Sequence, residues 1–79
     1  KHIPVATRDN GKITVQVGSV LHPMTEEHYI EWIAVVSDDG TERISLSPTN
    51  EPKAVFCDKK NAEVYAYCNL HGLWKAEVK

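Results

Sequence analysis

The feature that most restricts the fold of this chain is a set of short segments in which apolar and polar residues alternate. In residues 12–17 (KITVQV), the side chains of Ile13, Val15 and Val17 fall on one face and the polar side chains on the other. Residues 28–36 (HYIEWIAVV) form the longest and most apolar of these segments. No helical period is sustained, so we expect an all-β fold with residues 28–36 as a central strand.

Turn-forming residues separate these segments at short intervals. Asp38-Asp39-Gly40 predicts a hairpin in which Gly40 takes a positive φ. Two prolines exclude residues 48–52 from a central strand. The expected strands are residues 2–7, 12–17, 28–36, 41–47 (with Ile44 and Leu46 inward), 53–58, 62–68 and 73–78. This rhythm predicts an antiparallel sandwich or barrel.

The length and composition exclude several classes of protein. Seventy-nine residues close only one small core, so residues 1–79 are expected to be a single domain. Nine Lys and Arg against eleven Asp and Glu, with no basic cluster, argue against a nucleic-acid partner. No apolar run approaches the roughly 20 residues of a membrane helix, and no secretory signal is recognised. Two cysteines are too few for a secreted disulfide scaffold, so we expect a cytoplasmic protein or a bound metal.

The histidines and cysteines are placed unevenly along the expected strands. All four histidines, His2, His22, His28 and His71, lie in loops or at strand ends, and so does Cys68. Loops carried on a rigid sheet are where proteins commonly place binding residues. These five residues are therefore candidate metal ligands, with solvated strand-end side chains as the alternative.

Two spacings support a metal site. Cys68 and His71 are separated by two residues in a turn, followed by Gly72, which lets a thiolate and an imidazole converge on one ion. His22 and His28 lie at the two ends of a short loop. Structural zinc is normally four-coordinate and rich in thiolates. Four imidazoles and one thiolate suit iron better, with four nitrogens in a plane, the sulfur along the axis and an open sixth position.

Three longer segments are specific enough to indicate a family. They are residues 1–5 (KHIPV), 22–33 (HPMTEEHYIEWI) and 67–75 (YCNLHGLWK). In this order they closely resemble superoxide reductases, the iron domain shared by neelaredoxins and the C-terminal part of desulfoferrodoxins. The resemblance covers essentially the whole chain and implies an immunoglobulin-like antiparallel β-sandwich of about seven short strands with one mononuclear non-haem iron.

The resemblance also implies a ligand set and a reaction. In the family, four histidines bind iron in an equatorial plane and a cysteine binds it axially. The matching positions are His2, His22, His28 and His71 in the plane and Cys68 on the axis. The implied reaction is one-electron reduction of superoxide to hydrogen peroxide. Rubredoxin or a similar protein is the implied electron donor, and a homo-oligomer the implied assembly.

Lys1 matches a lysine that lies beside the iron in the family, where it attracts superoxide and orders a proton-donating water. An ordinary flexible lysine is the alternative. The glutamate that commonly precedes this lysine and caps the oxidised iron has no counterpart in the 79 residues, nor has the cysteine-rich module of desulfoferrodoxins. Glu26 and Glu27 are expected to be solvated. One metal centre per chain is therefore expected.

Three other residues are expected to be structural. Cys57 has no counterpart among the ligands and is predicted to be an inert, partly buried thiol. Trp32 and Trp74 are predicted to pack between the sheets, with stacking near the histidines as the alternative. Two other functions remain open: a metal-binding immunoglobulin-like module without activity, and a one-electron carrier without superoxide turnover.

Overall fold

A computed structural model describes residues 2–78 of the chain. It contains seven strands: β1 (Pro4–Asp9), β2 (Lys12–Val17), β3 (Ile30–Ser37), β4 (Gly40–Ser45), β5 (Lys53–Cys57), β6 (Glu63–Cys68) and β7 (Gly72–Glu77). None of the described residues is helical, so no helix in this part of the chain could cross a membrane. The predicted all-β fold of about seven short strands is confirmed.

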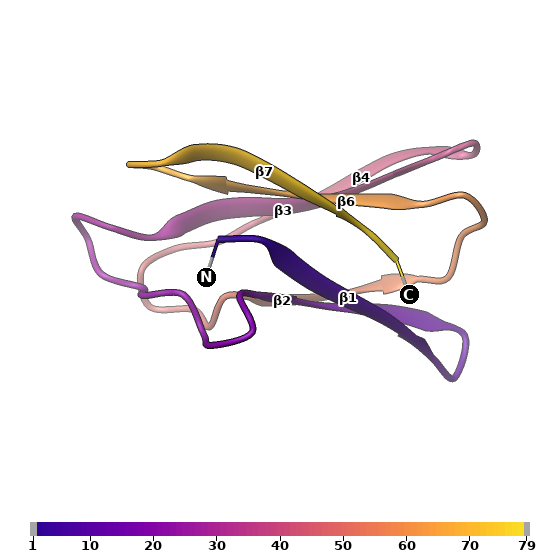
Figure 1. The fold of residues 1–79 in the computed structure, drawn as a ribbon, viewed down its shortest axis with the longest axis horizontal. Coiled ribbons are helices and arrows are strands. Elements are labelled where there is room, and N and C mark those ends of the chain that lie inside the picture. Colours follow the sequence, from indigo (N-terminus) through magenta and orange to yellow (C-terminus); the bar gives the residue numbers. More distant parts are fainter. Residues whose placement is uncertain (1, 79) are drawn as a thin grey trace.

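The strands form two antiparallel sheets that lie one above the other (Figure 1). The small sheet has the strand order β1-β2-β5, and the large sheet has the order β4-β3-β6-β7. β3 is paired on both sides, by β4 and β6, which confirms that the most apolar segment is a central strand. The fold is therefore a sandwich of three and four strands.

The core lies between the sheets and consists of the inward-facing residues of both. Ile13, Val15 and Val17 of β2 are fully buried, as their alternation predicts. The other core residues are Ala6, Ile30, Ile33, Val35, Ala54, Phe56, Ala62, Val64, Ala66 and Cys68. Removal of these apolar side chains from water is the main force that holds the two sheets together.

Strand β3 departs from the simple alternation of its sequence. Its pairing with β6 is irregular between Ile30 and Trp32, and such a bulge moves the side chains after it to the opposite face. Ile30 therefore shares the buried face with Ile33 and Val35. Trp32 instead stacks on Tyr67, with ring centroids 5.8 Å apart, and it is absent from the core. The prediction that Trp32 packs between the sheets is wrong.

Strand β4 lies at an edge of the large sheet. All of its residues are exposed, including Ile44, because only one of its sides is paired and the small sheet does not extend across it. Leu46, just after the strand, packs partly buried against the core. The inward position is thus confirmed for Leu46 and wrong for Ile44.

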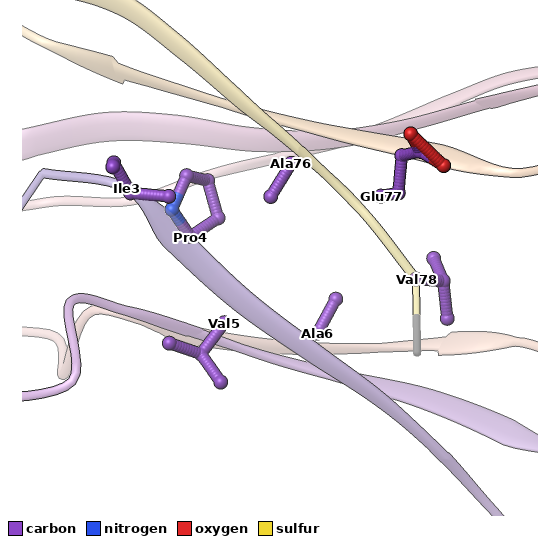
Figure 2. Close-up of a pocket in the computed structure, with 7 residues that line it drawn as sticks. All are labelled: Ile3, Pro4, Val5, Ala6, Ala76, Glu77 and Val78. Atoms are coloured by element: carbon purple, nitrogen blue, oxygen red, sulfur yellow. The ribbon is translucent and has the colours of Figure 1, made fainter.

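A groove of about 530 Å³ opens between the edge strands β1 and β7 (Figure 2). Its lining is mostly apolar and consists of Ile3, Pro4, Val5, Ala6, Ala76, Glu77 and Val78. This lining contains no histidine or cysteine, so the groove is separate from the candidate ligands.

Candidate metal centre

The antiparallel register brings several strand ends together at one end of the sandwich, on the left of Figure 1. Pro4 pairs with Val17, Ile30 pairs with Cys68, and Cys68 also pairs with Gly72. The start of β1, the end of β2, the start of β3 and the β6–β7 turn therefore all lie at this end. The five candidate ligands belong to these segments, although they are far apart in the sequence.

The loop between β2 and β3 carries His22 and His28. The backbone N–H of His22 donates to the carbonyl of Val17 at 3.0 Å, which keeps His22 close to the end of β2. Thr25 and His28 exchange two backbone hydrogen bonds of 3.0 and 3.1 Å, and the Thr25 hydroxyl also accepts from the His28 N–H. This turn holds His28 outside the sheet, so β3 begins at Ile30 and not at residue 28.

Asn69 ties the β6–β7 turn to the same loop. Its backbone N–H donates to the carbonyl of Tyr29 at 3.1 Å, and its Oδ1 accepts from the Tyr29 N–H at 2.9 Å. Its Nδ2 donates to the carbonyl of Glu27 at 3.0 Å. Because Glu27 and Tyr29 flank His28, these three bonds fix His28 relative to the turn.

The four histidine rings form a closed circle of neighbours. The ring centroids are 4.7 Å apart for His2 and His22, 4.6 Å for His22 and His28, 5.0 Å for His28 and His71, and 4.6 Å for His71 and His2. These neighbouring rings are inclined to one another by 67° to 80°. Across the circle, His2 and His28 are 6.1 Å apart. Four imidazoles in this order surround a common centre.

Cys68 lies beside this circle and is fully buried. The candidate ligand atoms of His2, His22, His28 and Cys68 all lie within 4.8 Å of one another. His71 joins them because its Nδ1 is 2.9 Å from Nε2 of His2 and 3.7 Å from Sγ of Cys68. The structure thus brings together all five residues that the sequence predicted as ligands.

The contacts also indicate which nitrogen each ring turns towards the centre. Nδ1 of His22 is 2.8 Å from the carbonyl oxygen of Pro23. Because a carbonyl only accepts, this nitrogen carries the proton, and Nε2 keeps the lone pair that binds a metal. Nε2 of His2 and Nδ1 of His71 face each other. Nε2 of His28 is buried and has no hydrogen-bond partner within residues 2–78.

These positions fit a single metal ion. A buried nitrogen without a hydrogen bond, such as Nε2 of His28, indicates a missing water or ion. Two imidazole nitrogens that bind one ion at right angles, each at about 2.1 Å, are about 3.0 Å apart. The 2.9 Å between the facing nitrogens of His2 and His71 agrees with this geometry. Imidazoles with one thiolate are also a donor set for a first-row transition metal, so the cluster is a candidate mononuclear metal site.

The crowding of the imidazoles changes their protonation. Desolvation lowers the pKa of His2 below its usual 6.5, and repulsion from His22 and His71 lowers it further. Metals bind the neutral imidazole and not the imidazolium. The cluster therefore favours the form of His2 that can act as a ligand.

Other residues considered from the sequence lie away from the centre or outside the described region. Lys1 is outside the described residues, so its role beside a metal remains a prediction. Glu26 and Glu27 are exposed, and no carboxylate of residues 2–78 joins the group of four. Cys57 is exposed at the end of β5, where it pairs with Lys12. The prediction of a partly buried thiol is wrong, because the last residue of β5 faces outwards.

Two residues near the centre make contacts that the main sequence predictions do not include. Asn69 is one of them, although its position directly after Cys68 is a usable signal. Trp74 is the other: it was expected in the core, whereas the residue is 36% exposed and its ring stacks on His2. The alternative interpretation, stacking on a candidate ligand, holds for Trp74.

Comparison with known proteins is consistent with this geometry. The family model described as Desulfoferrodoxin matches residues 1–77. The chain belongs to the desulfoferrodoxin family. It is 53% identical over 78 residues to a desulfoferrodoxin of Clostridium acetobutylicum, covering 99% of this chain and 62% of that protein. It is 38% identical over 99 aligned positions to a superoxide reductase of Pyrococcus abyssi, covering 100% of this chain and 86% of that protein.

The fold is similar to that of solved members of the family. The superoxide reductase from Treponema pallidum superposes with a TM-score of 0.86 at 39% identity, covering 96% of this chain and 65% of that one. The chain spans about 62% of the length of the desulfoferrodoxins that it matches. These relatives therefore contain further residues that have no counterpart in the 79 residues of this chain.

Proposed function

We propose that this domain is a superoxide reductase. The overall reaction takes one superoxide, one electron and two protons to one hydrogen peroxide. The observation that carries the proposal is the closed circle of four histidine rings beside the buried thiol of Cys68. The relatives named superoxide reductase in Pyrococcus abyssi and Treponema pallidum support it.

In this proposal the five residues bind one iron ion. His2, His22, His28 and His71 would hold the ion through imidazole nitrogens, and Cys68 would hold it through its thiolate. The order of the rings in the circle places His2 opposite His28 and His22 opposite His71. Bound there, iron would supply the exchange of one electron with the substrate.

The residues of the chain set the charge of the centre. A ferrous ion, one thiolate and four neutral imidazoles together carry a charge of +1, although the formal net charge of the chain is −2. A local positive charge attracts an anion such as superoxide. His22 and Cys68 are buried and shielded from water, whereas His71 is exposed. The centre is therefore open to water on the side of His71.

The proposal also includes a partner, an assembly and a compartment. A rubredoxin-like protein supplies the electron, and Lys1 attracts superoxide; both rest on the family resemblance. A homo-oligomer is supported by β4, an edge strand with exposed residues that is available for pairing. A cytoplasmic location is supported by the exposed thiol of Cys57, which suits a reducing compartment.

The test compares the two cysteines after reconstitution with iron. Oxidation of the wild-type protein should produce a thiolate-to-ferric charge-transfer band in the red. Cys68→Ser should abolish this band, and the matched variant Cys57→Ser should retain it. The ferrous wild-type protein should then consume superoxide at close to the diffusion limit in pulse radiolysis.

Three outcomes would reject parts of the proposal. A colourless protein with stoichiometric zinc would exclude the iron centre. A red band that persists in Cys68→Ser would exclude this cysteine as the ligand. An iron-loaded protein that exchanges electrons without consuming superoxide would be a one-electron carrier and not a reductase.

A further inference from the structure

The candidate ligand His2 is held differently from His22 and His28. His22 is anchored through its Nδ1 to the carbonyl of Pro23, and His28 is anchored through the turn with Thr25. His2 lies before β1, and the first backbone hydrogen bond after it is from the N–H of Gly18 to the carbonyl of Ile3, at 3.2 Å. The position of the His2 ring must therefore depend on side-chain contacts.

Trp74 is a residue outside the candidate ligand set that contacts His2. Its ring stacks on the imidazole of His2 with a centroid distance of 5.1 Å and an angle of 20°. Its Nε1–H also donates to the carbonyl of His71 at 3.2 Å. Trp74, in β7 of the large sheet, thus makes two contacts. Its ring contacts His2, which precedes β1 of the small sheet, and its N–H contacts the turn just before β7.

We propose that Trp74 is a positioning residue that fixes the ring plane of His2 and the backbone of His71 for metal binding. This inference rests on the proposed ligand set. Trp74 itself offers no ligand atom, because the indole N–H is a donor only. The stacked indole covers one face of the His2 imidazole and restricts its rotation about χ2, while the hydrogen bond restricts the turn. Trp74 thereby contacts both residues whose nitrogens, Nε2 of His2 and Nδ1 of His71, face each other at 2.9 Å.

Positioning of this kind is expected to act on metal affinity. A ligand that is already oriented loses less conformational freedom when the ion binds. A residue such as Trp74, which orients a ligand without binding the ion itself, therefore contributes to metal affinity. Trp32 provides a contrast within the same sheet. It stacks on Tyr67 with ring centroids 5.8 Å apart and lies under the guanidinium of Arg43, and it contacts none of the four histidines through a stacked ring.

The experiment measures cobalt(II) affinity, by competition with a chelator, for the wild-type chain and for Trp74→Leu, Trp74→Phe and Trp32→Leu. Trp74→Leu removes both contacts and should weaken cobalt binding by roughly 10-fold or more. Trp74→Phe keeps an aromatic ring and loses the N–H, so it should weaken binding by about threefold. Trp32→Leu should bind cobalt as the wild type does.

Thermal unfolding of the metal-free variants separates positioning from general destabilisation. Both leucine variants lose an aromatic contact and should unfold at a lower temperature than the wild type, whereas only the Trp74 variants should lose affinity. An unchanged affinity of Trp74→Leu, or an equal loss in Trp32→Leu, would overturn the inference. If Trp74→Leu does not fold, an affinity of Trp74→Phe equal to that of the wild type would overturn it.

The spectrum of the wild-type protein separates this inference from the proposed function. A wild-type chain that binds no cobalt, or binds it without a thiolate charge-transfer band, would overturn the proposed ligand set and the role of Trp74 with it. A wild-type chain that binds cobalt through thiolate, with no effect of Trp74, would overturn the role of Trp74 alone.

Discussion

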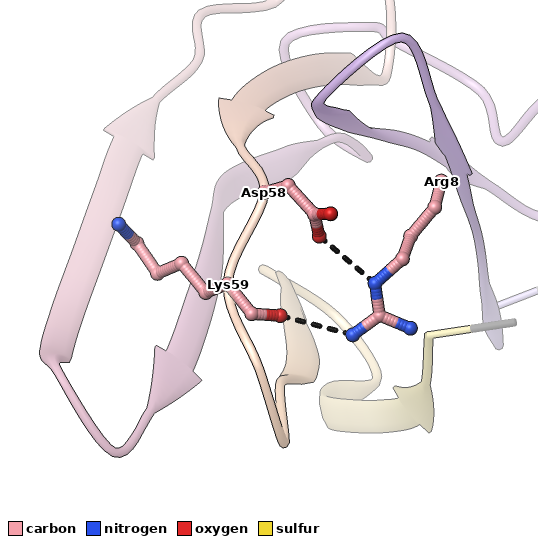
Figure 3. Close-up of polar contacts among 3 residues, drawn as sticks. All are labelled: Arg8, Asp58 and Lys59. Atoms are coloured by element: carbon pink, nitrogen blue, oxygen red, sulfur yellow. Dashed lines mark hydrogen bonds and ion pairs between the residues drawn. The ribbon is translucent and has the colours of Figure 1, made fainter.

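The two ends of the sandwich are closed by different kinds of interaction. At the end that contains the start of β1 and the β6–β7 turn, the two sheets meet through histidine rings and a buried thiol. At the opposite end, the β5–β6 loop is held by ion pairs and hydrogen bonds between exposed groups (Figure 3). Under the proposed function, only the histidine end depends on a bound ion.

The opposite end is complete without a ligand. Nε of Arg8 donates to Oδ1 of Asp58 at 2.8 Å, and its Nη2 donates to the carbonyl of Lys59 at 2.9 Å. Nζ of Lys59 is also 2.8 Å from a carboxylate oxygen of Glu42 in β4. Lys59 therefore connects β1 of the small sheet with β4 of the large sheet through groups that remain partly in water.

Under the proposed function, the histidine end is complete only with an ion. Four imidazoles that face one another repel if they are protonated, and the buried Nε2 of His28 lacks a hydrogen bond among the described residues. A bound metal satisfies these nitrogens at once. The contacts of Arg8 and Lys59 thus form without an ion, whereas under the proposed function the histidine end is stabilised by metal binding.

Of the changes considered, metal removal should have the largest effect on the difference in stability between the two ends. A metal at about 1,000 times its dissociation constant should raise the free energy of unfolding by roughly 4 kcal/mol. Removal should also speed the amide exchange of His28 and Asn69, whose N–H groups bond within the histidine end, and leave that of Asp58 unchanged. Hydrogen exchange by mass spectrometry or NMR measures this, and an equal response at both ends would contradict the comparison.

Asn69→Ala should have the next largest effect, because it removes two side-chain hydrogen bonds that join the turn to the β2–β3 loop. We expect a loss of about 1–3 kcal/mol in stability, since the Tyr29 N–H loses its partner. Metal affinity should fall by roughly 10-fold.

Asn50→Ala is the matched control for Asn69→Ala. Oδ1 of Asn50 accepts from the N–H of Ser47 at 2.8 Å and from its hydroxyl at 3.2 Å, both within the β4–β5 loop. This variant should lose stability and keep its metal affinity. Equal affinity losses in the two variants, measured by chelator competition, would show that Asn69 has no special role at the metal end.

Arg8→Gln should have the smallest effect. Its ion pair with Asp58 is about 40% exposed on both sides, and exposed pairs contribute roughly 1 kcal/mol or less. Urea unfolding of the metal-free protein should detect this small loss, and metal affinity should not change. A change in affinity would show that the two ends are coupled through the sheets.

The sequence allowed the strands and the candidate ligands to be predicted because both depend on local patterns. The limits of β2, Lys12–Val17, agree with those of its alternating segment. The five ligand candidates could be found because histidine and cysteine in loops are chemically distinctive, and their convergence followed from the antiparallel register. The turn at Asn10 and Gly11, with φ of 51° and 76°, also has a local signal, the Asn-Gly pair, which the alternation of apolar residues does not detect.

The features that could not be predicted depend on contacts between distant residues. Trp32 and Trp74 are of the same type and both lie in strands, so sequence gives them the same role. A bulge turns Trp32 to the outer face, and the edge position of β7 brings Trp74 to His2. The hydrogen bond between Asn69 and Tyr29 joins residues 40 positions apart and needs the paired sheet.

The circle of histidines also determines when the centre can form during folding. Its contact between His2 and His71 joins residues 69 positions apart, and His22 and His28 come from a loop between them. We expect contacts at such sequence separation to form after the local hairpins, because loop closure costs entropy before these contacts reward it. A metal bound here would then act on sheets that have already paired. We therefore expect it to slow the opening of the native state more than it accelerates the collapse of the unfolded chain.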